Sequence, residues 1–169
     1  MDYELYMKEA LKEAEKALNK GEFPVGCVLV HNNEIITTGS RKGTVNQINN
    51  ELDHAEIMAL RNLTELESTK KIDRNRTIAF STLEPCLMCF GALLINQIRT
   101  IIYAYEDVMG GGTGINLSSM PPLYSQNKIT IKGGVLRKQS LNLMKEFFNS
   151  PQNKYLNNTF LAKYTINAS

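Results

Sequence analysis

The first regular pattern of apolar and polar positions covers residues 3–19. Its apolar residues recur every three or four positions, as they do along one face of an α-helix. Gly21 follows the last of them, and glycine is common just beyond the end of a helix. The chain is therefore predicted to begin with an amphipathic helix that packs its apolar face on a core.

A β-branched run follows from Val25 to Val30, and the pair Asn32-Asn33 separates it from a second short run over residues 34–38. Two asparagines between two such runs favour a tight hairpin turn, so the sequence predicts two antiparallel strands. Residues 39–52 are polar and contain several asparagines and glycines. This composition predicts a loop.

Three more strands and three more helices are predicted from the rest of the apolar pattern, and one of these helices runs from His54 through Leu63. Strands are expected at residues 77–82, 100–105 and 128–132, and helices at about 85–97 and from Leu136 to Phe148. A strand, a helix and a strand in that order imply a parallel crossover connection. The predicted fold is α/β, a three-layer α/β/α sandwich around a mixed five-stranded sheet.

The chain ends in a segment of about residues 150–169 that we expect to be a helical tail. Ser150-Pro151 resembles a helix cap followed by a first helical residue, and Leu156, Phe160 and Tyr164 would then share one face. An apolar face of this kind serves packing or a subunit contact. Because no linker composition divides the sequence, residues 1–169 are expected to form a single domain.

Composition restricts the class of protein. Hydrophobic residues make up 43% of the 169 residues and charged residues 21%, and no apolar run is long enough to span a bilayer. The acidic N-terminus does not resemble a secretory signal, and the odd number of cysteines argues against disulfides, so we expect a cytoplasmic protein that does not enter a membrane. The formal net charge is only +2, and the basic residues are scattered, which weakens the case for a nucleic-acid partner.

The candidate chemistry lies in His54-Ala55-Glu56 and in Pro85-Cys86-Leu87-Met88-Cys89. One imidazole and two thiolates can bind Zn²⁺ and leave its fourth coordination position open for water. We expect Asp53 to cap the helix that carries His54 and Glu56, and Pro85 to be the first residue of the cysteine helix. The cysteines would then lie near a helix N-terminus, which lowers the pKa of a thiol.

This residue set predicts a hydrolytic deaminase of an aminated nucleobase. Zinc-activated water would attack the ring carbon that carries the amino group, and ammonia would leave. The transfer of protons from the water to the ring and the leaving amine needs a mobile carboxylate, which is the role we assign to Glu56.

Two other classes of protein remain open. A CxxC pair can act as a thiol oxidoreductase, although that reading leaves His54 and Glu56 unexplained. The zinc can also be structural in a binding module, although closed structural sites normally use four protein ligands. Cys27 and His31 lie outside the set and are interpreted as a buried apolar residue and a solvated turn residue. Gly110 to Gly114 lack the pattern of a phosphate-binding loop and are interpreted as a flexible turn that can also serve as a substrate loop.

Three segments carry a resemblance to a known family. They are Pro24-Val25-Gly26, His54-Ala55-Glu56-Ile57-Met58-Ala59-Leu60 and Thr82-Leu83-Glu84-Pro85-Cys86-Leu87-Met88-Cys89. Together they resemble the cytidine and deoxycytidylate deaminase superfamily, especially the bacterial tRNA-specific adenosine deaminases, over roughly residues 5–148. The resemblance implies that His54, Cys86 and Cys89 bind zinc, that Glu56 moves protons, that Asp107 lies near the substrate, and that the enzyme is a homodimer.

The sequence departs from this family at two points. Relatives commonly carry Gly-x-Asn after the second strand, with the asparagine on the substrate, whereas this chain has Gly39-Ser40-Arg41. We expect Asn46, Asn49 or Asn50 to replace that amide, and Ala55 to line the substrate site. The family's tRNA enzymes also tend to place basic residues after the Phe-Phe pair, and this chain has none at residues 149–153. The expected substrate is adenosine in tRNA, converted to inosine, ahead of free cytosine, guanine, cytidine or adenosine.

Overall fold

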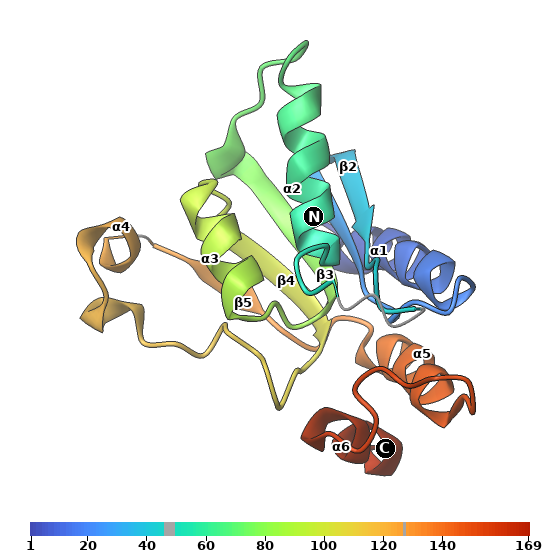
Figure 1. Ribbon diagram of the computed structural model, residues 1–169. Coiled ribbons are helices and arrows are strands. Elements are labelled where there is room, and N and C mark those ends of the chain that lie inside the picture. The colour runs from blue at the N-terminus through green and yellow to red at the C-terminus, as the bar shows by residue number, and fades with distance from the viewer. Residues whose placement is uncertain (46–49, 127) are drawn as a thin grey trace.

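A five-stranded mixed sheet forms the centre of the computed structural model, which describes residues 1–45, 50–126 and 128–169 (Figure 1). The strands are β1 Gly26–His31, β2 Glu34–Ser40, β3 Thr77–Leu83, β4 Thr100–Tyr105 and β5 Thr130–Lys132. Their order across the sheet is β2-β1-β3-β4-β5. β1 runs antiparallel to both β2 and β3, whereas β3, β4 and β5 are parallel. The predicted crossover between the third and fourth strands is confirmed.

Helices cover both faces of the sheet. They are α1 Tyr3–Leu18, α2 Ala55–Leu66, α3 Leu87–Ile95, α4 Pro122–Ser125, α5 Arg137–Asn149 and α6 Phe160–Asn167, with short 3₁₀ turns at Arg74–Arg76 and Leu117–Ser119. α2 and α3 pack on one face, and α1 packs on the other with α5 beside it (Figure 1). The predicted three-layer sandwich is confirmed. Within the described ranges, no helix combines the length and the apolar character that a bilayer crossing requires.

Successive side chains of β1 point to opposite faces of the sheet, and the core therefore has two layers. Cys27 and Leu29 face the layer under α2 and α3, and Val28 and Val30 face the layer under α1. All four side chains are fully buried because helices cover both sides of this central strand. The following turn is the predicted two-residue hairpin, in which Asn32 and Asn33 both adopt positive φ angles of 51° and 65°.

Two helix starts differ from the sequence-based prediction. Asp53 does not cap α2, because its carboxylate accepts hydrogen bonds from Asn50 and Arg61, and His54 takes the cap position without a side-chain cap bond. Pro85 lies outside α3, whose cap is Cys86. His54 and Cys86 therefore both occupy cap positions without a side-chain hydrogen bond to their own helices. The fifth strand is also shorter than predicted and contains three exposed residues.

The predicted helix start at Ser150-Pro151 is wrong. Residues 151–159 form turns, and Leu156 and Asn158 have positive φ angles of 54° and 63°, which a helix does not accept. The terminal helix begins only at Phe160, where the Thr159 hydroxyl accepts a hydrogen bond from the amide of Ala162. A threonine cap supplies an acceptor for the otherwise unpaired first amides of the helix.

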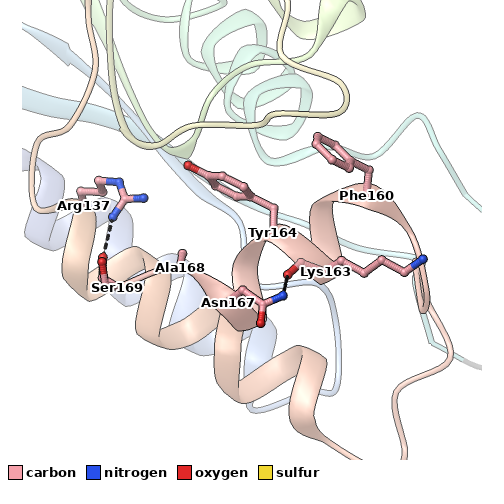
Figure 2. A pocket seen from close by; sticks show the side chains of 7 residues that line it. All are labelled: Arg137, Phe160, Lys163, Tyr164, Asn167, Ala168 and Ser169. Atoms are coloured by element: carbon pink, nitrogen blue, oxygen red, sulfur yellow. Dashed lines mark hydrogen bonds between the residues drawn. The ribbon is translucent and has the colours of Figure 1, made fainter.

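The C-terminal segment is anchored to the rest of the molecule. Figure 2 shows Arg137, at the start of α5, donating a hydrogen bond to the carbonyl of Ser169. The same guanidinium forms an ion pair of 2.6 Å with Glu106, and the Tyr164 hydroxyl donates to that carboxylate at 2.7 Å. These contacts lower the pKa of the Glu106 carboxyl to about 2, chiefly through its hydrogen bonds from Arg137.

We predict that Gly39→Ala weakens both the fold and the metal centre. A Cβ at this position would lie 2.1 Å from the carbonyl oxygen of Ala55 and 2.6 Å from the amide of Ala59, so the start of α2 would have to move. Overpacking of this kind costs about 1–3 kcal/mol of unfolding free energy, which urea titration measures. Zinc content should fall as well. The matched control is Gly114→Ala, whose Cβ meets nothing within 4 Å, and an equal loss in that variant would contradict the packing argument.

We predict that Glu106→Gln reduces stability at neutral pH but not in acid. The folded pKa of Glu106, about 2, lies below the ordinary value of 4.5. The ion pair therefore stabilises the fold above about pH 4.5, and its contribution disappears as the pH falls toward 2. The expected loss at pH 7 is about 1–2 kcal/mol after allowance for partial exposure. In the exposed pair of Glu9 with Lys12, Glu9→Gln should change stability by less than about 0.5 kcal/mol. A constant difference between wild type and Glu106→Gln from pH 7 to pH 2 would refute this assignment.

Candidate functional site

Two helix starts bring the predicted metal ligands together. His54 caps α2 and Cys86 caps α3, and Cys89 lies in the first turn of α3. The Nδ1 atom of His54 lies 3.6 Å from Sγ of Cys86, and the ligand atoms of His54, Cys86 and Cys89 all lie within 4.8 Å of one another. The three residues that the sequence proposed as a metal site thus meet in space.

The donor set and its spacing fit zinc. With bonds of about 2.3 Å to sulfur and 2.0–2.1 Å to nitrogen, tetrahedral geometry separates an imidazole and a thiolate ligand by about 3.6 Å. The observed separation between His54 and Cys86 agrees with that value. The other ring nitrogen of His54 lies 3.8 Å from the Glu51 carboxylate. That separation is too long for a hydrogen bond, and this buried nitrogen has no hydrogen-bond partner among the described residues.

The group has three members in the part of the chain that the structure describes, and Glu56 is not one of them. Three protein ligands are typical of catalytic zinc, which keeps one position for water or substrate, whereas structural zinc normally has four. The geometry therefore disfavours the structural-zinc alternative.

The local environment favours a thiolate at Cys86. Its pKa is lowered to about 4, first by the hydrogen bond from the Cys89 thiol and then by His54. The glycine segment braces this turn, since Gly111 pairs with Cys86 and the amide of Gly112 donates to the carbonyl of Pro85. A Cβ on Gly112 would lie 2.7 Å from the amide nitrogen of Leu87, so only glycine allows this approach. The segment that the sequence suggested as a flexible turn is packed against the cysteine turn.

Glu56 lies in the first turn of α2 and is 3% exposed. The Ser81 hydroxyl donates to its Oε1 atom at 3.0 Å, which orients the carboxyl from the neighbouring strand β3. Burial raises the pKa of the Glu56 carboxyl above its ordinary value, because desolvation disfavours the charged form. A carboxyl in this setting can accept and release a proton closer to neutral pH than an exposed glutamate can.

A cavity of about 200 Å³ adjoins these residues, and His54, Glu56 and Cys86 form part of its wall. Of the predicted substrate contacts, Ala55 and Asp107 line the cavity. Asn50 is not among the lining residues, and its side chain bonds instead to Asp53 and to the amide of Leu52. Asn46 and Asn49 lie outside the described residues.

Sequence reasoning did not identify several residues of the cavity wall. Arg41 lines the cavity with a side chain that is only 2% exposed, and Tyr155, Leu156 and Leu161 reach it from the C-terminal segment. Arg41 stands at the position where the family commonly has an asparagine. A basic residue after a strand gives no local sign of burial, and contacts across more than 100 residues have no signal in a single sequence.

Comparison with known proteins supports the chemistry of the site. Residues 1–105 match the model of the cytidine and deoxycytidylate deaminase zinc-binding region. The chain is 34% identical over 143 residues to a tRNA-specific adenosine deaminase of Streptococcus pyogenes, covering 85% of this chain and 87% of that protein. It is 32% identical over 151 residues to the Bacillus subtilis protein of the same name, covering 89% and 91%.

Solved structures show the same fold. One from a study of A-to-I editing by tRNA:A34 deaminases superposes with a TM-score of 0.68 at 28% identity, covering 82% of this chain and 97% of that chain. The guanine deaminase of Bacillus subtilis superposes with a TM-score of 0.53 at 31% identity, covering 63% of this chain and 66% of that chain. The matched zinc-binding region and the identity to these relatives agree with the three-donor group found in the structure. The chain therefore belongs to the cytidine and deoxycytidylate deaminase family and is a zinc-dependent deaminase.

Proposed function

We propose that the protein hydrolyses the amino group of a nucleobase, with zinc held by His54, Cys86 and Cys89 and with Glu56 as the residue that moves protons. The observation that carries this proposal is a buried carboxyl beside a three-donor metal group at the wall of a cavity. The reaction consumes one water, replaces the exocyclic amine by a carbonyl oxygen, and releases ammonia.

When bound, zinc acts as a Lewis acid that lowers the pKa of water to about 7. Glu56 takes the proton that the attacking water gives up and passes it to the ring nitrogen next to the amino-bearing carbon. The same carboxyl then takes the proton of the hydroxyl group now on that carbon and delivers it to the leaving amine, so that ammonia departs and a carbonyl oxygen remains. Ser81 keeps the carboxyl oriented for both transfers, because its hydroxyl holds one of the two carboxyl oxygens.

We also propose Ala55 and Asp107 as substrate contacts, which their place on the cavity wall supports. Burial raises the pKa of the Asp107 carboxyl, so the residue is less easily charged than a surface aspartate. Its Oδ1 atom accepts hydrogen bonds from the amides of Met109 and Gly110, which hold it in place. Contacts from Asn46, Asn49 and Asn50 stay predictions.

Two kinds of substrate are candidates: a base within tRNA, and a free base or nucleoside. Adenosine in tRNA is favoured by the names of the bacterial relatives, each of which matches more than 80% of this chain. A free base or nucleoside is favoured by the small cavity, and one of the similar structures is a guanine deaminase.

We propose that the enzyme is a homodimer that joins through the outer side of α3. Leu87 and Ile95 are 61% and 55% exposed and lie two turns apart on this helix, and Met109 and Met120 add exposed apolar side chains from the loop after β4. A contiguous patch of exposed apolar residues usually marks a protein interface, and the exposure of Leu87 and Ile95 on one helix supports this proposal.

Residues 1–169 are proposed to act as one domain, because side chains of α6 share a core cluster with α2 and α3. A cytoplasmic location is proposed because all three cysteines are free, and two of them must stay reduced to bind zinc.

We predict that Glu56→Gln keeps its zinc but loses activity. The glutamate is outside the metal-binding group, and loss of a general acid and base lowers kcat by about 100-fold to 10,000-fold. Metal analysis and ammonia release from free bases, nucleosides and tRNA provide the two measurements. The exposed Glu15→Gln on α1 is the control. Turnover of Glu56→Gln within tenfold of wild type would remove Glu56 from the mechanism.

The dimer is tested by light scattering after size-exclusion chromatography. We expect wild type at about twice the chain mass of 19.0 kDa and the double variant Leu87→Glu, Ile95→Lys at the mass of one chain, because charges on this face oppose its burial. Leu5→Glu, on an exposed position of α1, should stay dimeric. Wild type eluting as a single chain would rule out the proposed assembly.

A further inference from the structure

The two ring nitrogens of His54 lie in different surroundings. Nδ1 lies 3.6 Å from Sγ of Cys86, within the metal-donor group, whereas Nε2 is buried and has no hydrogen-bond partner among the described residues. A metal bound to Nδ1 uses the lone pair of that nitrogen, so Nε2 then carries the ring proton and is a donor. A buried donor without an acceptor costs free energy, so the zinc-bound histidine needs an acceptor at Nε2.

A carboxylate on the loop before α2 lies close to this unpaired nitrogen. The Oε2 atom of Glu51 is 3.8 Å from Nε2 of His54, whereas an ordinary N–H···O bond measures at most about 3.2 Å. The side chain of Glu51 is 57% exposed, so packing against neighbours does not fix it. A shift of about 1 Å between the imidazole and the carboxylate would complete the hydrogen bond.

Two donors hold that carboxylate oxygen in place. The Nη2 atom of Arg41 donates to Oε2 of Glu51 at 2.9 Å, and the Tyr155 hydroxyl donates to the same oxygen at 2.8 Å. Nη2 also donates to the Tyr155 hydroxyl oxygen at 3.2 Å, and the guanidinium lies over the Tyr155 ring, 5.7 Å from its centroid. The oxygen that lies near His54 is therefore the one that both donors fix.

Arg41 has no terminal N–H group left for a substrate. Each terminal nitrogen of a guanidinium carries two hydrogens. Nη1 donates to the carbonyls of Lys42 and Asn50, and Nη2 donates to Glu51 and Tyr155. The side chain is only 2% exposed, so water competes little with these bonds. Where relatives commonly have an asparagine on the substrate, this chain has an arginine that binds the Glu51 carboxylate instead.

Tyr155 reaches this network from the C-terminal segment. Its ring packs against that of Phe23, with their centroids 5.5 Å apart, and its amide donates to Oδ1 of Asn153 at 2.8 Å. Farther along the segment, Leu161 is 1% exposed in the core. Tyr155 is therefore held by contacts that do not involve Glu51, and it can serve as a fixed anchor for that carboxylate. It lies beyond residues 1–105, which the family model matches.

We propose that Glu51 accepts a hydrogen bond from Nε2 of His54 in the zinc-bound enzyme, and that Arg41 and Tyr155 hold the carboxylate for this contact. Arg41 and Tyr155 are positioning residues, because they act on the metal through Glu51 and His54. An acceptor of this kind fixes the orientation and the tautomer of a metal-binding imidazole and strengthens it as a ligand. The C-terminal segment thereby raises the affinity for zinc. This inference rests on the zinc site of the proposed function.

The first experiment measures the zinc affinity of the full-length chain by competition with a chelator of known affinity. Loss of the partner of a metal-binding histidine lowers metal affinity by about 10-fold to 100-fold, and Glu51→Ala should show a loss of that size. Tyr155→Phe removes only a hydroxyl that holds the partner, so its loss should be smaller, roughly threefold to tenfold. Glu51→Gln should recover part of the affinity lost in Glu51→Ala, because its amide oxygen still accepts a hydrogen bond.

Tyr164→Phe is the matched control. Tyr164 lies in the same segment, and its hydroxyl also donates to a carboxylate, that of Glu106 at 2.7 Å, but it lines a different pocket (Figure 2). Its zinc affinity should equal that of wild type. Equal zinc affinity in wild type, Glu51→Ala and Tyr155→Phe would overturn the inference. If Glu51→Ala does not fold, because it leaves the buried guanidinium without its charged partner, Tyr155→Phe alone decides.

The second experiment observes the hydrogen bond itself by NMR of the zinc-loaded, ¹⁵N-labelled protein. The chain has only two histidines, His31 and His54, so His31→Gln assigns their ring signals. We expect a downfield proton on Nε2 of His54 in wild type and in Tyr164→Phe. In Glu51→Ala and Tyr155→Phe this proton should move upfield or disappear by exchange with water. A general loss of stability does not move this one signal selectively.

The outcomes of the NMR experiment separate the inference from the proposed function. An unchanged His54 signal in Glu51→Ala and Tyr155→Phe would overturn the inference and leave the zinc site intact. A wild-type protein that binds no zinc, or zinc that leaves the His54 signals unchanged, would instead reject the proposed metal centre.

Discussion

The site depends on two helices that each begin at a proposed zinc ligand. His54 and Cys86 occupy the cap positions of α2 and α3, and neither side chain bonds to its own helix. An ordinary capping residue in each place would stabilise its helix by about 1 kcal/mol. The fold gives up that stabilisation, and metal binding can offset it because a metal that binds only the folded chain contributes its binding free energy to folding. The positive ends of the two helices also favour a thiolate at Cys86.

The positions of these two helix starts depend on close backbone contacts at two glycines. Gly39 on β2 allows the first turn of α2 to pack directly on the sheet, and Gly112 allows the loop after β4 to lie against the cysteine turn. Neither position has room for a larger residue. Glu56 then comes to lie over β3, where Ser81 binds it and burial raises its pKa. The same packing that excludes water from the core thus places a carboxyl with altered acidity next to the metal donors.

Two arginines attach the C-terminal segment to the rest of the molecule, one of them beside the site. Arg41 binds it near the metal group, and Arg137 binds it through Glu106 and the carbonyl of Ser169. Its loss would therefore open the cavity and expose part of the core at once. In this chain one wall of the cavity comes from a segment that follows the region matched by the family model.

Sequence alone determined the elements whose signals are local. Apolar periodicity predicted the sheet and the main helices, and the spacing of His54, Glu56, Cys86 and Cys89 predicted the metal chemistry, because each signal lies within a few neighbouring residues. Tertiary structure decided what depends on distant contacts. Asp53 does not cap α2, because its carboxylate binds Asn50 and Arg61 instead. The terminal helix is capped by Thr159 rather than by Ser150, and Arg41 is a buried link to Tyr155. Such outcomes follow from competition among hydrogen-bond partners and from burial, which exist only once the chain has folded.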